Sequence, residues 1–117
     1  MIKIYGIKNC NTVKNALNWL TEHQIQFHFH DYKKDGIDLE QLEKFLQKFG
    51  HEKLINRKGT TWRQLNSEQQ NSIIDNNSAL KLMIEKPSVI KRPIVDLGQQ
   101  QLLGFDAEEY KQKFATK

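Results

Sequence analysis

Cys10 is the residue of this chain best suited to covalent chemistry, and it is the only cysteine among 117 residues. It closes a polar turn over residues 6–10 and precedes a segment with helical spacing, which places it at a helix N-terminus. The free N–H groups and the dipole of a helix N-terminus favour a thiolate, and Lys8 and Lys14 add positive charge nearby. The alternative is a small buried hydrophobic residue, the common fate of a free cysteine. The polar turn favours the reactive thiol.

The four histidines do not form a metal-site pattern. His28 and His30 alternate along a predicted strand and would share one face of it. A zinc site usually needs several cysteines, or Cys-x-x-Cys or His-Glu-x-x-His spacing, and this chain has neither. We therefore predict no metal ion. Trp19 and Trp62 are interpreted as packing groups rather than as platforms for a ligand.

The elements that would position Cys10 begin with a strand, a helix and a second strand. Residues 1–5 have the composition of a short buried strand, and Asn11 or Thr12 can cap the helix that follows. Residues 27–32 alternate in the manner of a strand. The two strands of such a unit are parallel. The apolar residues at helical spacing are Val13, Ala16, Leu17 and Leu20.

The middle of the chain has helical character. After a predicted loop over residues 33–36, apolar side chains recur at helical spacing over residues 39–49. Residues 51–86 show no strand-like alternation, and Ser67 with Gln70 forms a capping-box pattern. We therefore predict a helical insertion over about residues 51–86.

Strand character returns near the C-terminus. Residues 94–96 and 102–105 are predicted to form a β-hairpin, and Asp106 with Glu109 forms a capping pair before a last helix. The order of elements predicts the α/β class and a thioredoxin-like fold, in which a βαβ unit and a ββα unit are separated by the helical insertion. The whole chain, residues 1–117, is predicted to be a single domain.

The composition narrows the class of protein further. Apolar residues make up 38% and charged residues 27% of the chain, as in a globular domain. No apolar run approaches the roughly 20 residues that span a bilayer, no signal-peptide pattern is present, and a lone cysteine favours the cytoplasm over secretion. The net charge of +4 suits an anionic partner. Because lysines and acidic residues are interleaved along the chain, this charge distribution favours a small anion or an anionic thiol as the partner over nucleic acid and membrane surfaces.

Four separate segments carry residue patterns that belong together. They are residues 5–14 (YGIKNCNTVK), 56–62 (NRKGTTW), 91–95 (KRPIV) and 103–105 (LGF). In this order they resemble the arsenate reductase (ArsC) family, and within it the YffB-like branch. The likeness covers nearly the whole chain, and four segments in the right order are more specific than any one of them. The resemblance implies the same thioredoxin-like fold.

The resemblance also implies roles for individual residues. Cys10 stands where family members have the catalytic cysteine, Arg57 where they have an arginine facing it, and Arg92 where they have an arginine beside a cis-proline, here Pro93. Two guanidiniums would stabilise a thiolate and bind an oxyanion or a carboxylate. We add local hydrogen-bond donors next to Cys10, so that the predicted binding site consists of Asn9, Asn11, Thr12, Arg57, Arg92 and Pro93.

Two departures from the family patterns bear on the activity. Arsenate reductases of the family use a third arginine in the hairpin before the last helix, where we place residues 99–101, all glutamine, which supply no charge for an oxyanion. Spx-type regulators often carry a Cys-x-x-Cys switch, whereas Val13 stands at the second position here. No intramolecular disulfide can form, so an external thiol must regenerate Cys10. Glutathione is the candidate, because its carboxylates suit Arg57 and Arg92.

The sequence thus predicts a glutathione-dependent thiol/disulfide oxidoreductase with no bound cofactor and with glutathione as cosubstrate. Its catalytic residues would be Cys10, Arg57 and Arg92. Two alternatives stay open: an Spx-like transcriptional regulator that binds RNA polymerase, and a true arsenate reductase with altered anion contacts. The enzyme hypothesis predicts that the pKa of Cys10 lies below its ordinary value.

Overall fold

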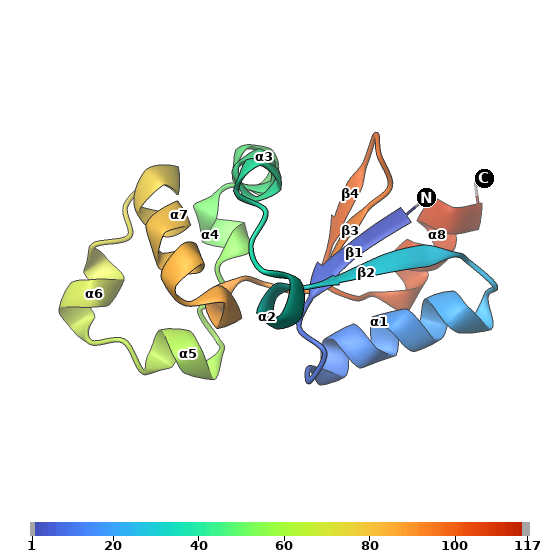
Figure 1. Cartoon of the computed structure of the whole chain (residues 1–117), viewed down its shortest axis with the longest axis horizontal. Coiled ribbons are helices and arrows are strands. Elements are labelled where there is room, and N and C mark those ends of the chain that lie inside the picture. The colour runs from blue at the N-terminus through green and yellow to red at the C-terminus, as the bar shows by residue number, and fades with distance from the viewer. Residues whose placement is uncertain (1, 116–117) are drawn as a thin grey trace. The chain divides into compact units, whose positions relative to one another are not determined.

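The computed structural model describes residues 2–115, which belong to two compact units. Of the described residues, 2–35 and 92–115 make up the first unit, and 36–91 make up the second (Figure 1). The second unit is longer than the predicted insertion of residues 51–86, because it includes the helix that precedes the insertion. In the described part of the chain, no helix is long and apolar enough to cross a membrane.

The first unit is built on a four-stranded sheet with the strand order β2-β1-β3-β4. The strands are β1 (Ile2–Gly6), β2 (Phe27–Asp31), β3 (Ile94–Asp96) and β4 (Gln101–Leu103). Strands β1 and β2 are parallel, and β3 is antiparallel to both β1 and β4. The helices of this unit are α1 (Asn11–Glu22), α2 (Tyr32–Asp35) and α8 (Ala107–Ala115). The predicted α/β class and the βαβ and ββα units of a thioredoxin-like fold are confirmed.

Helix α1 begins directly after Cys10, one or two residues earlier than predicted. Cys10 has extended backbone angles (φ −133°, ψ 124°) and is the N-cap, so Asn11 and Thr12 already lie within the helix. The prediction that one of these two residues caps the helix is therefore wrong. The predicted apolar stripe is confirmed, because three of its residues are fully buried: Val13, Ala16 and Leu20.

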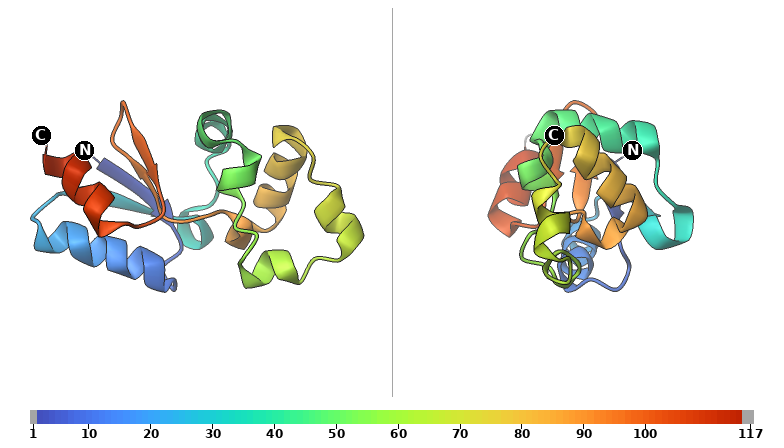
Figure 2. Two further views of the ribbon diagram at one scale, coloured as in Figure 1. Left: turned by 180° about the vertical axis from the view of Figure 1, so that it is seen from behind. Right: turned by 90° about the vertical axis from the view of Figure 1, so that its left-hand side faces the viewer.

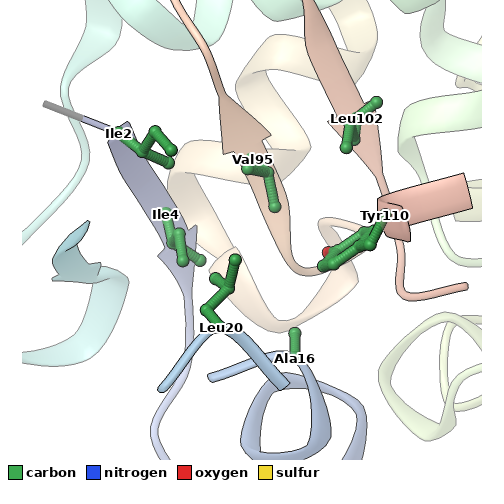
Figure 3. Packing of buried hydrophobic residues seen from close by; sticks show 7 residues of the cluster. All are labelled: Ile2, Ile4, Ala16, Leu20, Val95, Leu102 and Tyr110. Carbon is green, nitrogen blue, oxygen red and sulfur yellow. The ribbon is translucent and has the colours of Figure 1, made fainter. Parts of the chain in front are cut away.

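Helices α1 and α8 cover one face of the sheet in the first unit (Figure 2). Figure 3 shows the side chains of this core turned toward one another between the strands and the two helices. Full burial of one such aliphatic side chain contributes about 1.5–3 kcal/mol to stability. Tyr110 adds a polar anchor, because its buried hydroxyl donates a 2.8 Å hydrogen bond to the carbonyl oxygen of Gly104. The residues of the core are Ile2, Ile4, Ala16, Leu20, Val95, Leu102 and Tyr110.

The end of β1 approaches α1 so closely that position 6 requires glycine. A Cβ added to Gly6 would lie only 2.9 Å from Cγ2 of Val13, a buried residue with a stiff branched side chain. We expect Gly6→Ala to lower the free energy of unfolding by about 1–3 kcal/mol, the usual cost of overpacking. Urea denaturation would measure the loss. In a Val13→Ala background the same substitution should cost much less, and an equal cost in both backgrounds would contradict this explanation.

Helix α2 takes in Tyr32, which was predicted to end a strand, and residues 33–35 of the predicted loop. The carboxylate of Asp31 accepts a 2.9 Å hydrogen bond from the N–H of Lys33. The carboxylate of Asp35 accepts a 3.0 Å hydrogen bond from the N–H of Asp31. These hydrogen bonds from backbone N–H groups to side-chain carboxylates stabilise one helical turn. The turn has no apolar periodicity from which it could be predicted, so the loop prediction is wrong here.

The second unit is helical, as predicted for the insertion. Its helices are α3 (Leu39–Phe49), α4 (His51–Leu54), α5 (Thr60–Arg63), α6 (Ser67–Asn71), α7 (Asn76–Glu85) and the 3₁₀ helix η1 (Pro87–Val89). Helix α3 packs against α4 and α7, and α5 packs against η1. The predicted capping box of Ser67 with Gln70 is wrong by one residue, because Asn66 caps α6 and exchanges hydrogen bonds with Gln69 at 2.8 and 3.0 Å.

Candidate active site around Cys10

Three segments of the first unit leave the sheet at the same edge (Figure 1). Gly6 and Asp31, the last residues of β1 and β2, are paired in the parallel register. Ile94, the first residue of the antiparallel strand β3, is paired with Tyr5. In α/β proteins, ligands bind at the carboxyl ends of parallel strands, which is this edge. The segments that meet there are residues 7–10, 32–35 and 92–93.

Cys10 lies at this edge, half-buried at the start of α1. Burial acts to raise the pKa of its thiol, but three groups that favour the thiolate outweigh it. They are the N–H of Val13, the guanidinium of Arg92, through a hydrogen bond and its charge, and the N–H of Thr12. The pKa of Cys10 is therefore below its ordinary value, as predicted. The N-cap residue Cys10 makes no capping hydrogen bond through its side chain. The N–H groups of Thr12 and Val13 are therefore available to stabilise the thiolate form of the sulfur.

Arg92 is held beside Cys10 by the segment that leads into β3. The Arg92–Pro93 peptide bond is cis, as the resemblance implied. Pro93 is buried, and its carbonyl oxygen accepts a 2.8 Å hydrogen bond from the N–H of Gly104, which directly follows β4. The start of β3 is thus fixed to the end of β4, and this places the Arg92 side chain where it hydrogen bonds to the Cys10 sulfur.

The other polar residues near Cys10 in the sequence are exposed. They are Lys8, Asn9, Asn11, Thr12 and Lys14. Thr12 acts on the thiol through its backbone N–H group. The groups that lower the pKa of Cys10 do not include the two lysines, so the cation that favours the thiolate is Arg92. A role for the Asn9 and Asn11 side chains stays a prediction.

Arg57 belongs to the second unit, where it follows a short bridge between Ile55 and Ile90. Its guanidinium carbon lies 4.9 Å from the ring centroid of Trp62, a buried residue of α5. Such a cation–π contact orients one planar face of an exposed guanidinium against the indole. Trp62 is thus a packing group, as predicted, and it also supports Arg57, which the sequence did not indicate. The placement of Arg57 facing Cys10 stays a prediction.

The three consecutive glutamines lie in the hairpin before the last helix, as predicted, but far from the Cys10 edge of the sheet. Strand β3 runs from the Cys10 edge toward the opposite edge, since Asp96 is paired with Lys3 near the start of β1. The turn of the β3–β4 hairpin, which carries residues 99 and 100, and Gln101 at the start of β4 therefore lie at the edge opposite Cys10. Gln101 donates hydrogen bonds there to Asp96, at 3.1 Å, and to the Gly98 carbonyl oxygen, at 3.3 Å. The interpretation of these glutamines as neutral substitutes for an anion-binding arginine is wrong.

Sequence reasoning missed one residue at the Cys10 edge. Tyr32 is the first residue of α2 and is buried, whereas the sequence analysis treated it only as the end of a strand. Its position in the sequence could have indicated this. Tyr32 directly follows a strand parallel to β1, so it lies beside the segment that follows β1 and carries Cys10.

Comparison with known proteins gives matches along nearly the whole chain. The model described as the ArsC family matches residues 5–113. An uncharacterized protein of Haemophilus influenzae is 46% identical over 115 residues, which are 98% of this chain and 100% of that protein. A solved structure named YFFB protein has a TM-score of 0.90 and 42% identity, and the match covers 96% of this chain and 97% of that one. The global transcriptional regulator Spx 2 of Lactococcus lactis is 29% identical over 111 residues, covering 93% of this chain and 83% of that protein.

Proposed function

This chain belongs to the ArsC family, and on that basis we propose that it is a glutathione-dependent thiol/disulfide oxidoreductase with Cys10 as its nucleophile. The observation that carries the proposal is the environment of the Cys10 sulfur. The helix N-terminus and the Arg92 guanidinium together lower the thiol pKa, which raises the share of nucleophilic thiolate near neutral pH. A buried structural cysteine would have the opposite shift.

The proposed reaction is a sequence of thiol–disulfide exchanges. The Cys10 thiolate attacks one sulfur of a substrate disulfide, forms a mixed disulfide with that half, and releases the other half as a thiolate. A glutathione thiolate attacks the mixed disulfide, which restores the Cys10 thiolate. A second glutathione then reduces the released glutathionyl disulfide. In sum, two glutathione molecules are oxidised to glutathione disulfide, and the substrate disulfide becomes two thiols.

An external thiol is needed because Cys10 has no second cysteine as a partner. Glutathione fits the arginines of the proposed site, since a guanidinium binds a carboxylate through two parallel hydrogen bonds. Arg92 would bind one carboxylate beside the thiol. Arg57, which Trp62 orients, stays a predicted carboxylate ligand. A reduced single thiol and glutathione as cosubstrate place the protein, by this proposal, in the cytoplasm.

Mass spectrometry of the intact protein tests the proposal directly. After mild oxidation with glutathione disulfide, we expect a mass increase of one glutathionyl group, which excess reduced glutathione removes. Protein alkylated at Cys10 beforehand is the control and should show no increase. The proposal fails if no adduct forms and the protein does not accelerate the glutathione-dependent reduction of a small disulfide.

A second candidate is a regulator that acts by binding RNA polymerase. It is favoured by the 29% identity to the Spx 2 regulator over most of both chains. This function would need no turnover at Cys10. A stable complex of the purified protein with RNA polymerase, unaffected by alkylation of Cys10, would support it. Efficient glutathione-dependent turnover of arsenate would instead support the arsenate reductase alternative.

A further inference from the structure

The Tyr32 hydroxyl is a buried hydrogen-bond donor. The side chain is only 5% exposed, and its oxygen has no hydrogen-bond partner within the described residues 2–115. Buried hydroxyl groups in native proteins are nearly always hydrogen bonded, because leaving one unpaired lowers stability. The hydroxyl of Tyr110 shows the ordinary case, since it donates a 2.8 Å hydrogen bond to Gly104. We therefore expect the Tyr32 hydroxyl to form a hydrogen bond with a ligand group in another state of the protein.

Neighbouring rings fix the position of the Tyr32 side chain. Its ring stacks on Tyr5 with a centroid distance of 6.3 Å and an interplanar angle of 26°. It meets the ring of His30 edge-on, with a centroid distance of 5.9 Å. Tyr5 and His30 are register partners in β1 and β2, and their own rings are 5.2 Å apart. The hydroxyl is thus presented by a packed cluster of three rings and not by a mobile side chain.

The Tyr32 hydroxyl lies in the electrostatic range of the arginine that contacts Cys10. Burial raises the pKa of Tyr32 strongly and Tyr5 adds to the rise, whereas the charge of Arg92 acts in the opposite direction. Since the net shift is upward, the phenol is protonated at neutral pH and can donate a hydrogen bond. Cys10, Arg92 and Tyr32 come from the three segments that meet at one edge of the sheet.

We propose that the Tyr32 hydroxyl is a binding group of the Cys10 site, where it donates a hydrogen bond to an anionic oxygen held by the Arg92 guanidinium. Two sources share this chemistry: a carboxylate of the thiol cosubstrate, which rests on the proposed function, and an inorganic oxyanion, which does not. Binding of either one supplies the partner that the hydroxyl lacks. A neutral donor beside a cation recognises an anion without adding charge that would disturb the thiolate.

The test compares two single-atom deletions, Tyr32→Phe and Tyr110→Phe. The probes are S-methylglutathione, which keeps the carboxylates but cannot form a disulfide, and inorganic sulfate, each titrated at constant ionic strength. We expect Tyr32→Phe to weaken binding of at least one probe roughly tenfold and to leave the thermal unfolding midpoint unchanged or higher. Tyr110→Phe, the matched control, should lower the midpoint because it breaks an existing bond, and it should leave binding unchanged.

The outcomes separate this inference from the proposed function. A Tyr32→Phe effect on S-methylglutathione identifies a carboxylate as the ligand, and an effect on sulfate alone identifies an oxyanion. Sulfate binding that depends on Tyr32 supports the inference even if no glutathione adduct of Cys10 forms. The inference is overturned if the wild-type protein binds neither probe or if Tyr32→Phe binds both with unchanged affinity. It is also overturned if Tyr32→Phe lowers the midpoint as Tyr110→Phe does.

Discussion

Replacing Cys10 with serine is expected to abolish disulfide reduction and, in mildly acidic solution, to make the folded protein more stable. Activity is lost because the chain has no other thiol and a hydroxyl cannot form a mixed disulfide. Stability rises because Cys10 is the N-cap of α1 and has the extended backbone angles that a capping serine adopts. A serine hydroxyl would accept the N–H of Val13 better than a neutral thiol does. The gain should be about 0.5–1 kcal/mol in the free energy of unfolding.

The pH dependence of this gain follows from the lowered pKa of Cys10. A thiol whose pKa is lower in the folded than in the unfolded protein adds stability that is fully present above the unfolded value of about 8.5. That contribution is lost as the pH falls through the folded pKa. Cys10→Ser should therefore exceed the wild-type stability most at about pH 5, where the thiol is neutral, and the difference should shrink as the pH rises.

Urea denaturation at several pH values, together with the disulfide reduction assay, measures both effects of Cys10→Ser. Cys10→Ala is the matched control, because it removes the sulfur without supplying a cap, so it should lose activity and gain no stability. Residual activity in either variant would exclude Cys10 as the nucleophile. A Cys10→Ser variant less stable than wild type at about pH 5 would show that contacts of the sulfur outweigh its poor capping.

The fold was predictable from the sequence wherever the pattern extends over several turns or several strand residues. The apolar residues of α1 and of α3 recur often enough to define both helices, and the alternation in β2 defines a strand parallel to β1. Short elements were not predictable in this way. Helix α2 is closed by the carboxylates of Asp31 and Asp35, and either Asn66 or Ser67 is a suitable N-cap for α6. The choice between adjacent caps depends on packing that the sequence does not display.

The site was predictable only in part, because strand register decides which residues share an edge of the sheet. Cys10 follows β1 directly, so its place at a helix start was evident from the sequence. The glutamines of the hairpin and Tyr32 were misjudged for one reason. The sequence shows how many residues separate the glutamines from Arg92 and Tyr32 from β2, but not at which end of the sheet each lies. The strand register decides this: Gly6 pairs with Asp31, which places Tyr32 near Cys10, and Lys3 pairs with Asp96, which places the hairpin turn at the opposite end.

Replacing Arg92 with alanine is expected to raise the pKa of Cys10 and to lower its reactivity. The variant loses both the hydrogen bond to the sulfur and the positive charge, whereas the burial that raises the thiol pKa persists. The N–H groups of Thr12 and Val13 persist as well, so some thiolate stabilisation should survive. Losing a hydrogen bond to a charged group costs about 1.5–3 kcal/mol, which corresponds to a decrease in kcat/KM of about 10- to 150-fold for disulfide reduction.

The rate of alkylation by iodoacetamide as a function of pH measures the thiol pKa without any substrate. In Arg92→Ala the midpoint of this profile should move to higher pH, and Arg92→Lys, which keeps the charge but not the guanidinium, should fall between. Lys91→Ala is the matched control, since it removes the same charge from the adjacent exposed residue. Equal shifts for Lys91→Ala and Arg92→Ala would mean that Arg92 acts only through net charge. An unchanged profile in Arg92→Ala would remove Arg92 as the partner of the thiolate, because a direct contact with the sulfur must alter its ionisation.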